Sequence, residues 1–260
     1  MSSPQRALVT GATAGLGREF AFQLASRGYE TVLVARDAKR LSALAQELAA
    51  AFPHLETETL SADLATDAGI ARVRERLSQP ESPIDVLVNN AGSGLAADFH
   101  ASPLADEKAL LTLLAWAPLA LSHAVLPSMR ARGRGFILNV ASLAGALPSG
   151  SYSAAKAHTI NLSRALAARY RADGVRVTAL LPGFVRTEFH DRMGVSAAGV
   201  PRIAWADARV VAREGLSALG RGRVVCVSDW RYRLVAPLIR AVPDRVIDRF
   251  NVLSREERPR

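Results

Sequence analysis

The stretch that decides the fold is Thr10-Gly-Ala-Thr-Ala-Gly-Leu-Gly17, between the short apolar segment Arg6–Thr10 and a segment of helical character, residues 16–27. A strand, a glycine-rich turn and a helix in this order allow backbone N–H groups to approach a pyrophosphate at the helix N-terminus. Glycines alone are weak evidence, because any tight turn between a strand and a helix can use them. The position of this turn near the N-terminus, between a strand and a helix, indicates a dinucleotide-binding unit.

The rest of the chain continues the alternation of strands and helices. We expect further strands at residues 30–35, 56–60, 84–88, 135–140, 175–181 and 223–227. The expected helices lie near residues 41–51, 68–77, 104–132, 151–171 and 206–219, and Pro118 and Pro127 should bend or break the longest one. Such alternation predicts an α/β fold, a single Rossmann-type doubly wound parallel sheet of about seven strands with helices on both faces.

The composition of the chain limits the classes of protein to which it can belong. The 260 residues suffice for one large domain, and no stretch approaches the ~18–20 apolar residues that span a bilayer. The start of the chain has no secretory apolar region, and the single cysteine, Cys226, has no partner for an intramolecular disulfide. We expect Cys226 to be buried in an apolar strand and the protein to be cytoplasmic. The five histidines show no metal-ligand spacing, so no metal is expected.

The chain is basic, with a net charge of +9. Only Lys39, Lys108 and Lys156 are lysines, and the arginines are scattered over most segments without a basic tract or interleaved aromatic residues. Nucleic-acid-binding proteins usually gather their positive charge on one face or along one helix. The pattern therefore does not favour nucleic acid as a partner.

Tyr152 and Lys156 lie four residues apart in a predicted helix and so share one face of it. A fixed ammonium favours the phenolate, so Lys156 should lower the pKa of Tyr152 from its ordinary value of about 10. Tyr152 would then act as an acid–base catalyst near neutral pH. Ser142, ten residues before Tyr152, offers a hydroxyl that can hold a substrate oxygen.

The residue that selects the dinucleotide is expected about 20 residues beyond the glycine-rich turn, where an acidic side chain would bind a ribose 2′-hydroxyl. Arg36 stands there instead, which suits a 2′-phosphate and favours NADP(H) over NAD(H), unless Arg36 is a solvated surface charge. Asp37 is better placed to cap the next helix.

Asp63 fits either a cap or turn, or a contact with an adenine amine. Asn90 fits either a turn or a cofactor contact.

The motifs share one location in the predicted sheet. Gly11–Gly17, Asn89–Gly92, Ser142 and Pro182–Gly183 all follow the carboxyl ends of predicted strands. In open α/β sheets, ligands bind in the crevice at that edge. One binding site is therefore expected there.

From about Arg6 to Asp229 the chain resembles the short-chain dehydrogenase/reductase family. The resemblance rests on Thr10-Gly-x-x-x-Gly-x-Gly17, Asp63, Asn89-Asn-Ala-Gly92, Ser142, Tyr152-x-x-x-Lys156 and Pro182-Gly-x-Val-x-Thr187. It implies an NADP(H)-dependent oxidoreductase that interconverts a carbonyl and an alcohol on a small-molecule substrate. Tyr152 would be the general acid or base, Lys156 would lower its pKa and hold the nicotinamide ribose, and Ser142 would orient the substrate oxygen.

The resemblance also implies a set of cofactor contacts, with Arg36 at the 2′-phosphate and Thr187 near the nicotinamide carboxamide. The full set is Gly11, Thr13, Gly15, Leu16, Gly17, Arg36, Asp63, Leu64, Asn90, Ala91, Gly92, Tyr152, Lys156, Pro182, Gly183, Val185 and Thr187. The family further suggests a homodimer or homotetramer built on the two long helices.

Two features depart from the family pattern. The spacing of ten residues from Ser142 to Tyr152 is shorter than usual, so the pocket beside the loop 143–151 should be reshaped. Leu114 stands where the family often has an asparagine that helps to bind a water in the proton relay to the lysine. A catalytically impaired nucleotide-binding regulator or scaffold of the same fold is therefore the alternative, although Ser142, Tyr152 and Lys156 are all present.

The C-terminal part has a different pattern. We divide the chain into a dinucleotide-binding and catalytic domain, residues 1–230, and a basic amphipathic extension, residues 231–260, which could lie on a membrane surface. More often such an apolar stripe packs on its own domain, closes over the substrate pocket or joins subunits. Phe184, Phe189 and Trp205 near the expected pocket favour a hydrophobic ketone or alcohol.

Overall fold

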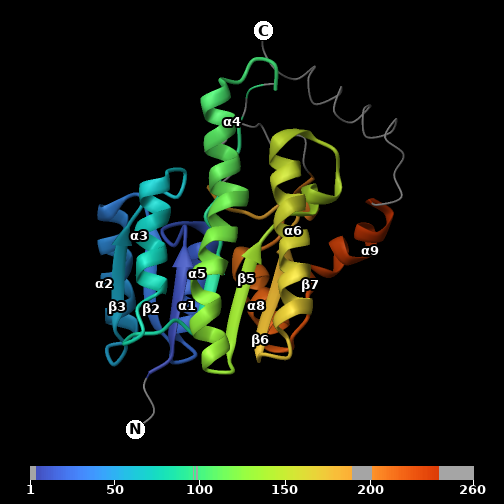
Figure 1. The fold of residues 1–260 in the computed structure, drawn as a ribbon. Coiled ribbons are helices and arrows are strands. Elements are labelled where there is room, and N and C mark those ends of the chain that lie inside the picture. The colour runs from blue at the N-terminus through green and yellow to red at the C-terminus, as the bar shows by residue number, and fades with distance from the viewer. Residues whose placement is uncertain (1–3, 96, 98, 189–200, 240–260) are drawn as a thin grey trace.

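A computed structural model describes residues 4–95, 97, 99–188 and 201–239. Its centre is a seven-stranded sheet in the order β3-β2-β1-β4-β5-β6-β7, and every neighbouring pair is parallel (Figure 1). The strands are β1 (Arg6–Thr10), β2 (Glu30–Ala35), β3 (Thr57–Ser61), β4 (Val86–Asn89), β5 (Gly135–Val140), β6 (Val175–Leu181) and β7 (Val225–Val227). The order reverses between β1 and β4, so the crevice of the doubly wound fold lies at their carboxyl ends. The predicted fold class is confirmed.

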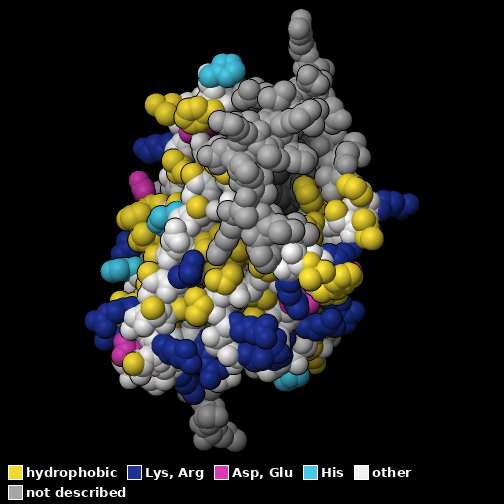
Figure 2. Space-filling view, turned by 90° about the vertical axis from the view of Figure 1, so that its right-hand side faces the viewer, with side chains coloured by type: hydrophobic (Ala, Val, Ile, Leu, Met, Phe, Trp, Pro, Cys, Tyr) yellow, Lys and Arg dark blue, Asp and Glu magenta, His cyan; other side chains and the backbone are white. Residues whose placement is uncertain are grey.

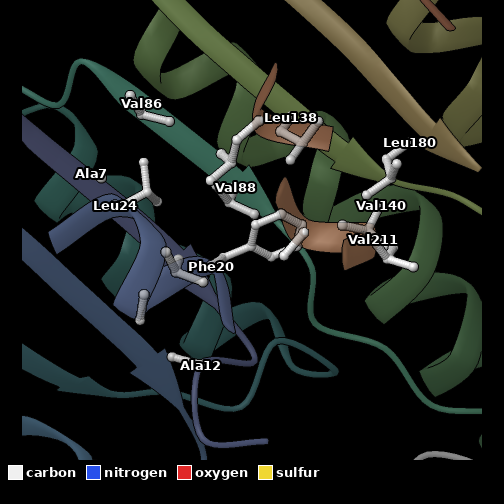
Figure 3. Close-up of a cluster of buried hydrophobic side chains, with 14 of the residues drawn as sticks. Ala7, Ala12, Phe20, Leu24, Val86, Val88, Leu138, Val140, Leu180 and Val211 are labelled. Atoms are coloured by element: carbon white, nitrogen blue, oxygen red, sulfur yellow. The ribbon is translucent and has the colours of Figure 1, made fainter. Parts of the chain in front are cut away.

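Helices cover both faces of the sheet (Figure 1). One face carries α1 (Gly15–Ala25), α2 (Ala38–Ala51) and α8 (Ala208–Gly220), and the other carries α3 (Asp67–Leu77), α5 (Ala117–Ala131) and α6 (Gly150–Tyr170). Each face has its own apolar core. In Figure 3 the ring of Phe20 from α1 lies among Val88, Val140 and Val211. Strands that are buried on both faces need apolar residues at successive positions, which explains the apolar runs in the sequence.

The longest helix runs without a break from α4 (Leu104–Leu111) through a π-helical turn, η1 (Thr112–Trp116), into α5. Neither Pro118 nor Pro127 breaks it, so the expected break is absent, whereas the expected bend stays a prediction. The wider π turn comes directly before Pro118, where it makes room for the proline ring. Figure 1 shows α4 projecting beyond the carboxyl edge of the sheet.

The expectation that no stretch is apolar enough to span a membrane was wrong. Within the described part of the chain, Leu104–Ala131 is the one helix that is long and apolar enough by length and composition. Half of its apolar window is buried inside the fold, and Leu121, Val125 and Met129 are fully buried against the sheet. A core helix passes the same test, so composition alone does not assign this helix to a membrane.

The chain ends, as far as it is described, in α9 (Trp230–Ile239), which follows β7. Tyr232 and Ala236 of α9 pack against a small core that includes Leu143 and Leu181. Residues 240–260, which hold the rest of the predicted amphipathic stripe, lie outside the described residues. The division at residue 230 stays a prediction, whereas the burial of Cys226 in β7 is confirmed.

Positive charge is unevenly spread on the side of the molecule where α9 lies. Figure 2 shows that Lys and Arg side chains on this side gather mainly in the lower half, among hydrophobic and polar ones. That half is the end of the sheet at which the strands begin. Among the described side chains that this view shows, the basic ones therefore lie mainly away from the carboxyl edge that carries the site motifs.

Candidate active site

The glycine-rich turn after β1 leaves no room for side chains at its three glycine positions. Gly11 and Gly15 have φ angles of 64° and 49°, which residues with a Cβ adopt only at a cost. A Cβ on Gly17 would lie 2.0 Å from the carbonyl oxygen of Gly11, and a Cβ on Gly11 would lie 2.9 Å from the Cα of Ala91. The backbones of the turn, of α1 and of the loop after β4 therefore meet closely.

Thr10 and Asn90 join this turn to the loop after β4. The Thr10 hydroxyl oxygen accepts the N–H groups of Asn90 and Ala91 at 2.9 and 3.0 Å. The Asn90 side-chain amide donates to the Thr10 carbonyl at 2.9 Å. Of the two roles left open for Asn90, the structure shows the turn, and a cofactor contact stays a prediction.

The predicted catalytic residues come together where β5 ends and α6 begins. The Ser142 hydroxyl accepts the N–H of Ala144 at 3.1 Å and is hydrogen-bonded to the Tyr152 side chain. Lys156, buried at 5% exposure, donates from Nζ to the Val140 carbonyl at 2.8 Å. Its Nζ lies 5.7 Å from the centre of the Tyr152 ring. A phenol, a hydroxyl and an ammonium therefore form one cluster.

The protonation of this cluster differs from the expectation. Burial raises the pKa of Tyr152 to about 12, although the hydrogen bond with Ser142 lowers it. Burial also lowers the pKa of Lys156 to about 8. Removal from water disfavours the charged form of both groups, and for Tyr152 this cost exceeds the opposing effect of the Ser142 hydrogen bond. The expectation that Lys156 gives Tyr152 a lowered pKa is therefore wrong for this structure.

The hydroxyl of Ser151, the residue before Tyr152, is hydrogen-bonded to Glu107. Glu107 of α4 is buried at 8% exposure and accepts a hydrogen bond from the Ser102 hydroxyl at 2.6 Å. Hydrogen bonds from Ser102 and, to a smaller extent, from Ser151 lower the pKa of the Glu107 carboxyl. Ser151 is thus bonded to α4, and Ser142 is the hydroxyl beside Tyr152. No pattern in the sequence pointed to Glu107.

Leu114 of the π-helical turn packs in the same apolar cluster as Tyr152. Its side chain is 1% exposed and packs with Leu110, Ala155 and Tyr152. Pro118 has no N–H to donate to the Leu114 carbonyl four residues earlier, and the hydroxyl of Thr159 from α6 donates to it instead at 2.9 Å. Apolar packing therefore surrounds the Leu114 side chain and Thr159 satisfies its carbonyl, and the correspondence of Leu114 with the family's asparagine stays a prediction.

At the end of β2, Asp37 caps α2 as predicted, because its carboxylate accepts the N–H of Arg40 at 3.0 Å. Arg36 is exposed beside it. Arg40 was not predicted from the sequence, and its guanidinium donates to the Thr13 carbonyl at 3.3 Å and pairs with Glu188 at 3.2 Å. Arg40 therefore connects α2 to the glycine-rich turn and to the segment after β6.

Asp63 forms a turn after β3, since its carboxylate accepts the N–H of Ala65 at 3.1 Å. The cap of α3 is Thr66, which accepts the N–H of Gly69 at 3.1 Å. Leu64 is buried in the core at 4% exposure. The turn is thus the observed role of Asp63, and the adenine contact stays a prediction.

The segment after β6 closes the other side of the site. A Cβ on Gly15 would lie 2.8 Å from Cγ2 of Thr187, so this segment lies directly on the glycine-rich turn. Val185 pairs with Ala206 in a parallel bridge. Among the residues predicted to wall the pocket, Phe184 and Trp205 have ring centres 5.7 Å apart, and Phe189 lies outside the described residues.

A hollow of about 510 Å³ lies beside the shortened loop between β5 and α6. It is lined by residues 145–150 and by Ser153, Ala154 and Ala157. Neither Ser142 nor Tyr152 lines it, so it is separate from the reactive cluster.

Known proteins resemble this chain in sequence and in structure. The family model described as short chain dehydrogenase matches residues 5–195. The chain belongs to the short-chain dehydrogenase family. A short-chain dehydrogenase from Sphingobium yanoikuyae in complex with NADPH is 31% identical, with a TM-score of 0.82 over 91% of this chain and 94% of that one.

Two curated relatives of this chain carry similar names. A very-long-chain 3-oxoacyl-CoA reductase-like protein of Arabidopsis thaliana is 29% identical over 95% of this chain and 80% of its own length. The very-long-chain 3-oxoacyl-CoA reductase of Coccidioides immitis is 31% identical over 83% of this chain and 61% of its own length. The chain thus spans most of the plant protein and less than two thirds of the fungal enzyme.

Proposed function

We propose that this short-chain dehydrogenase is an NADP(H)-dependent oxidoreductase that interconverts a carbonyl and an alcohol, with Tyr152 as general acid or base. The single observation that carries the proposal is the cluster at the start of α6. There the Tyr152 phenol is hydrogen-bonded to Ser142 and the Lys156 ammonium lies 5.7 Å from its ring centre. Membership of an oxidoreductase family agrees with this chemistry.

The residues around the glycine-rich turn fit a dinucleotide. Their backbone comes so close together that Cβ atoms would fill the space, and the first turn of α1 contains no acidic residue to repel a phosphate. Exposed Arg36 suits a 2′-phosphate, and the Sphingobium yanoikuyae relative was solved with NADPH. We assign the pyrophosphate to residues 11–17, adenosine to Asp63, Leu64 and Asn90–Gly92, and the nicotinamide end to Pro182, Gly183, Val185 and Thr187.

The bound cofactor would supply or accept the hydride at the reacting carbon. Tyr152, with a pKa of about 12, is protonated at neutral pH and so is ready to donate to a carbonyl oxygen. Lys156, with a pKa of about 8, is mostly charged at neutral pH and stabilises the phenolate that remains. The Ser142 hydroxyl accepts the Ala144 N–H and is hydrogen-bonded to Tyr152, and in this proposal it turns its proton to the charge that builds on the substrate oxygen.

We propose a hydrophobic substrate, and a long-chain 3-oxoacyl thioester is the first compound to test. Both curated relatives are named for very-long-chain 3-oxoacyl-CoA reduction. Apolar side chains are also exposed near the carboxyl edge of the sheet, including Phe99 at 75%, Leu104 at 84% and Phe184 at 40%. Such surface favours a ligand with a long apolar part.

The proposal predicts that Tyr152→Phe lowers the rate of NADPH-dependent reduction of such a thioester by about 10²–10⁴-fold, because the acid is lost. NADPH should still stabilise the variant against thermal unfolding, by roughly 2.7 kcal/mol at about 100 times its dissociation constant. NADH should need much higher concentrations for the same effect. Tyr170→Phe, at the far end of α6, is the control and should leave turnover unchanged.

The alternative of a regulator or scaffold makes the opposite prediction. The wild-type protein would then bind NADPH and turn over no carbonyl or alcohol, and Tyr152→Phe would change nothing. No stabilisation by either cofactor would contradict both functions.

Assembly and location stay predictions. We propose a homodimer or homotetramer on the long helices, where Leu111 and Trp116 are exposed at 42% and 51%. A cytoplasmic location, with peripheral membrane contact through the C-terminal segment, is proposed on composition alone.

A further inference from the structure

Tyr232 of α9 packs directly on the segment that follows β6. A Cβ on Gly183 would lie 2.1 Å from the Cζ atom of the Tyr232 ring and 2.3 and 2.5 Å from its two Cε atoms. Only glycine at position 183 lets the ring lie against the backbone in this way. The next residue, Phe184, which is 48 positions from Tyr232, bonds to the same tyrosine.

The Tyr232 hydroxyl joins two separate parts of the chain. It accepts the N–H of Phe184 at 3.0 Å and donates to the carbonyl of Ala204 at 2.5 Å. Phe184 follows β6, whereas Ala204 ends the short 3-10 turn η3 (Arg202–Ala204) that precedes α8. The backbone of these parts is also paired, because the Ala206 N–H donates to the Phe184 carbonyl at 2.8 Å. One side chain thus fixes both segments.

Contacts around the first turn of α9 hold Tyr232 in its position. Asp229, which precedes α9, is the one non-glycine residue with a positive φ, 68°, among the residues that the structure describes. Its N–H donates to the Glu214 carboxylate of α8 at 2.8 Å, and Arg233 pairs with the same carboxylate at 2.8 Å. Arg231 pairs with Asp229 and donates to the Ile203 carbonyl. Several contacts therefore anchor the first turn of α9 to α8 and to η3.

The segment that Tyr232 covers reaches the glycine-rich turn through Thr187, which lies against Gly15. We propose that Tyr232 is a positioning residue that fixes Pro182–Thr187 at the nicotinamide end of the site, so that α9 is part of the active site. This inference rests on the proposed function, because that function assigns the nicotinamide end to this segment. In the described part of the chain, the hydrogen bonds of the Tyr232 hydroxyl involve none of the residues that are assigned to adenosine.

The test uses Tyr232→Phe in the full-length protein, with Tyr170→Phe as the matched control. Two probes are compared: NADPH, and 2′,5′-ADP, which carries the adenosine and 2′-phosphate but no nicotinamide. We expect Tyr232→Phe to weaken NADPH binding and to lower kcat by about tenfold each, from the loss of its hydrogen bonds. Binding of 2′,5′-ADP should stay within about twofold, and Tyr170→Phe should change none of these values.

A second variant tests the same contact from the other side. Gly183→Ala should push the ring away and give the same pattern, with NADPH binding weakened and 2′,5′-ADP binding retained. A merely structural role predicts a lower melting temperature with unchanged affinities and kcat for Tyr232→Phe, and this result would overturn the inference. Equal losses for both probes would overturn it as well.

The proposed function and the positioning role fail in different ways. If the wild-type protein binds neither probe, the proposed function is wrong and the positioning role falls with it. If the wild-type protein binds both probes and turns over substrate, and Tyr232→Phe does so equally well, only the positioning role is wrong.

Discussion

The two sides of the candidate active site are held together by different means. On the N-terminal side, the turn after β1 and the loop after β4 are joined by backbone contacts of glycines and by Thr10 and Asn90. On the C-terminal side, the segment after β6 is held by the ring and hydroxyl of Tyr232, a side chain from the last described helix. The first side depends on residues inside recognisable motifs, and the second depends on a residue outside every motif.

The difference follows from how tightly each residue is constrained. No other residue can replace a glycine that has a positive φ, or a glycine at which a Cβ would lie 2.0 Å from a carbonyl oxygen. The glycine motif in the sequence therefore records the contact. A tyrosine in a helix that packs on a distant loop obeys only the general preference for burying aromatic surface. Its role becomes visible only when the chain is folded.

The largest expected effect tests the N-terminal side. Gly17→Ala places a Cβ 2.0 Å from the Gly11 carbonyl oxygen, and the backbone there has no flexible side chain that could yield. We expect the free energy of unfolding, measured in urea, to fall by about 3 kcal/mol or more.

Gly220→Ala, at the end of α8, is the control, since a Cβ at that position meets nothing within 4 Å. It should leave stability unchanged or raise it by up to about 1 kcal/mol, because alanine favours a helix. Similar losses in both variants would show that close backbone contact does not hold the N-terminal side.

A smaller effect is expected at Lys156, which lies between the two sides. Its pKa in the folded protein, about 8, is below its ordinary value of 10.5, so the unfolded chain binds the proton more tightly. Stability should therefore rise between pH 8 and 10.5, by up to about 3 kcal/mol. Lys156→Met should reduce this rise in urea unfolding measured from pH 8 to 10.

The comparison between the two proteins isolates Lys156, because their other titrating groups are shared. Tyr152, with its pKa raised to about 12, opposes the trend only above pH 10, where the unfolded phenol ionises first. Parallel pH profiles for wild type and Lys156→Met would contradict a lowered lysine pKa.

The smallest effect compares one helix cap from each side. Asp207 caps α8 by accepting the N–H groups of Arg209 and Val210 at 2.8 and 3.3 Å, and Asp37 caps α2 by accepting the N–H of Arg40 at 3.0 Å. Asp207→Ala and Asp37→Ala should each cost about 1 kcal/mol of unfolding free energy. Equal losses of unfolding free energy would mean that the helix caps are alike and that the two sides of the site differ in their loops. A cost of about 3 kcal/mol for Asp207→Ala alone would mean that helix α8 also holds the C-terminal side.

The sequence was sufficient for the sheet and for the meeting of Ser142, Tyr152 and Lys156. Strand positions follow from apolar runs that must be buried on both faces, and the observed strands β1, β2, β5 and β6 have the predicted bounds. The reactive side chains follow strand ends or share a helix face, so local geometry brings them to one edge. These features depend on contacts that are short in sequence or are dictated by the topology.

Only the tertiary structure decided the pKa values in that cluster and which distant segments hold the loops of the site. Burial raises the pKa of Tyr152 although its hydrogen bond with Ser142 lowers it, and no spacing in the sequence reports how much water a folded chain excludes. Arg40 with Glu188 and Tyr232 with Gly183 are pairs far apart in sequence, and each partner is an ordinary residue in its own segment. The sequence by itself therefore determined which groups can react, and the packing of distant segments determined their environment.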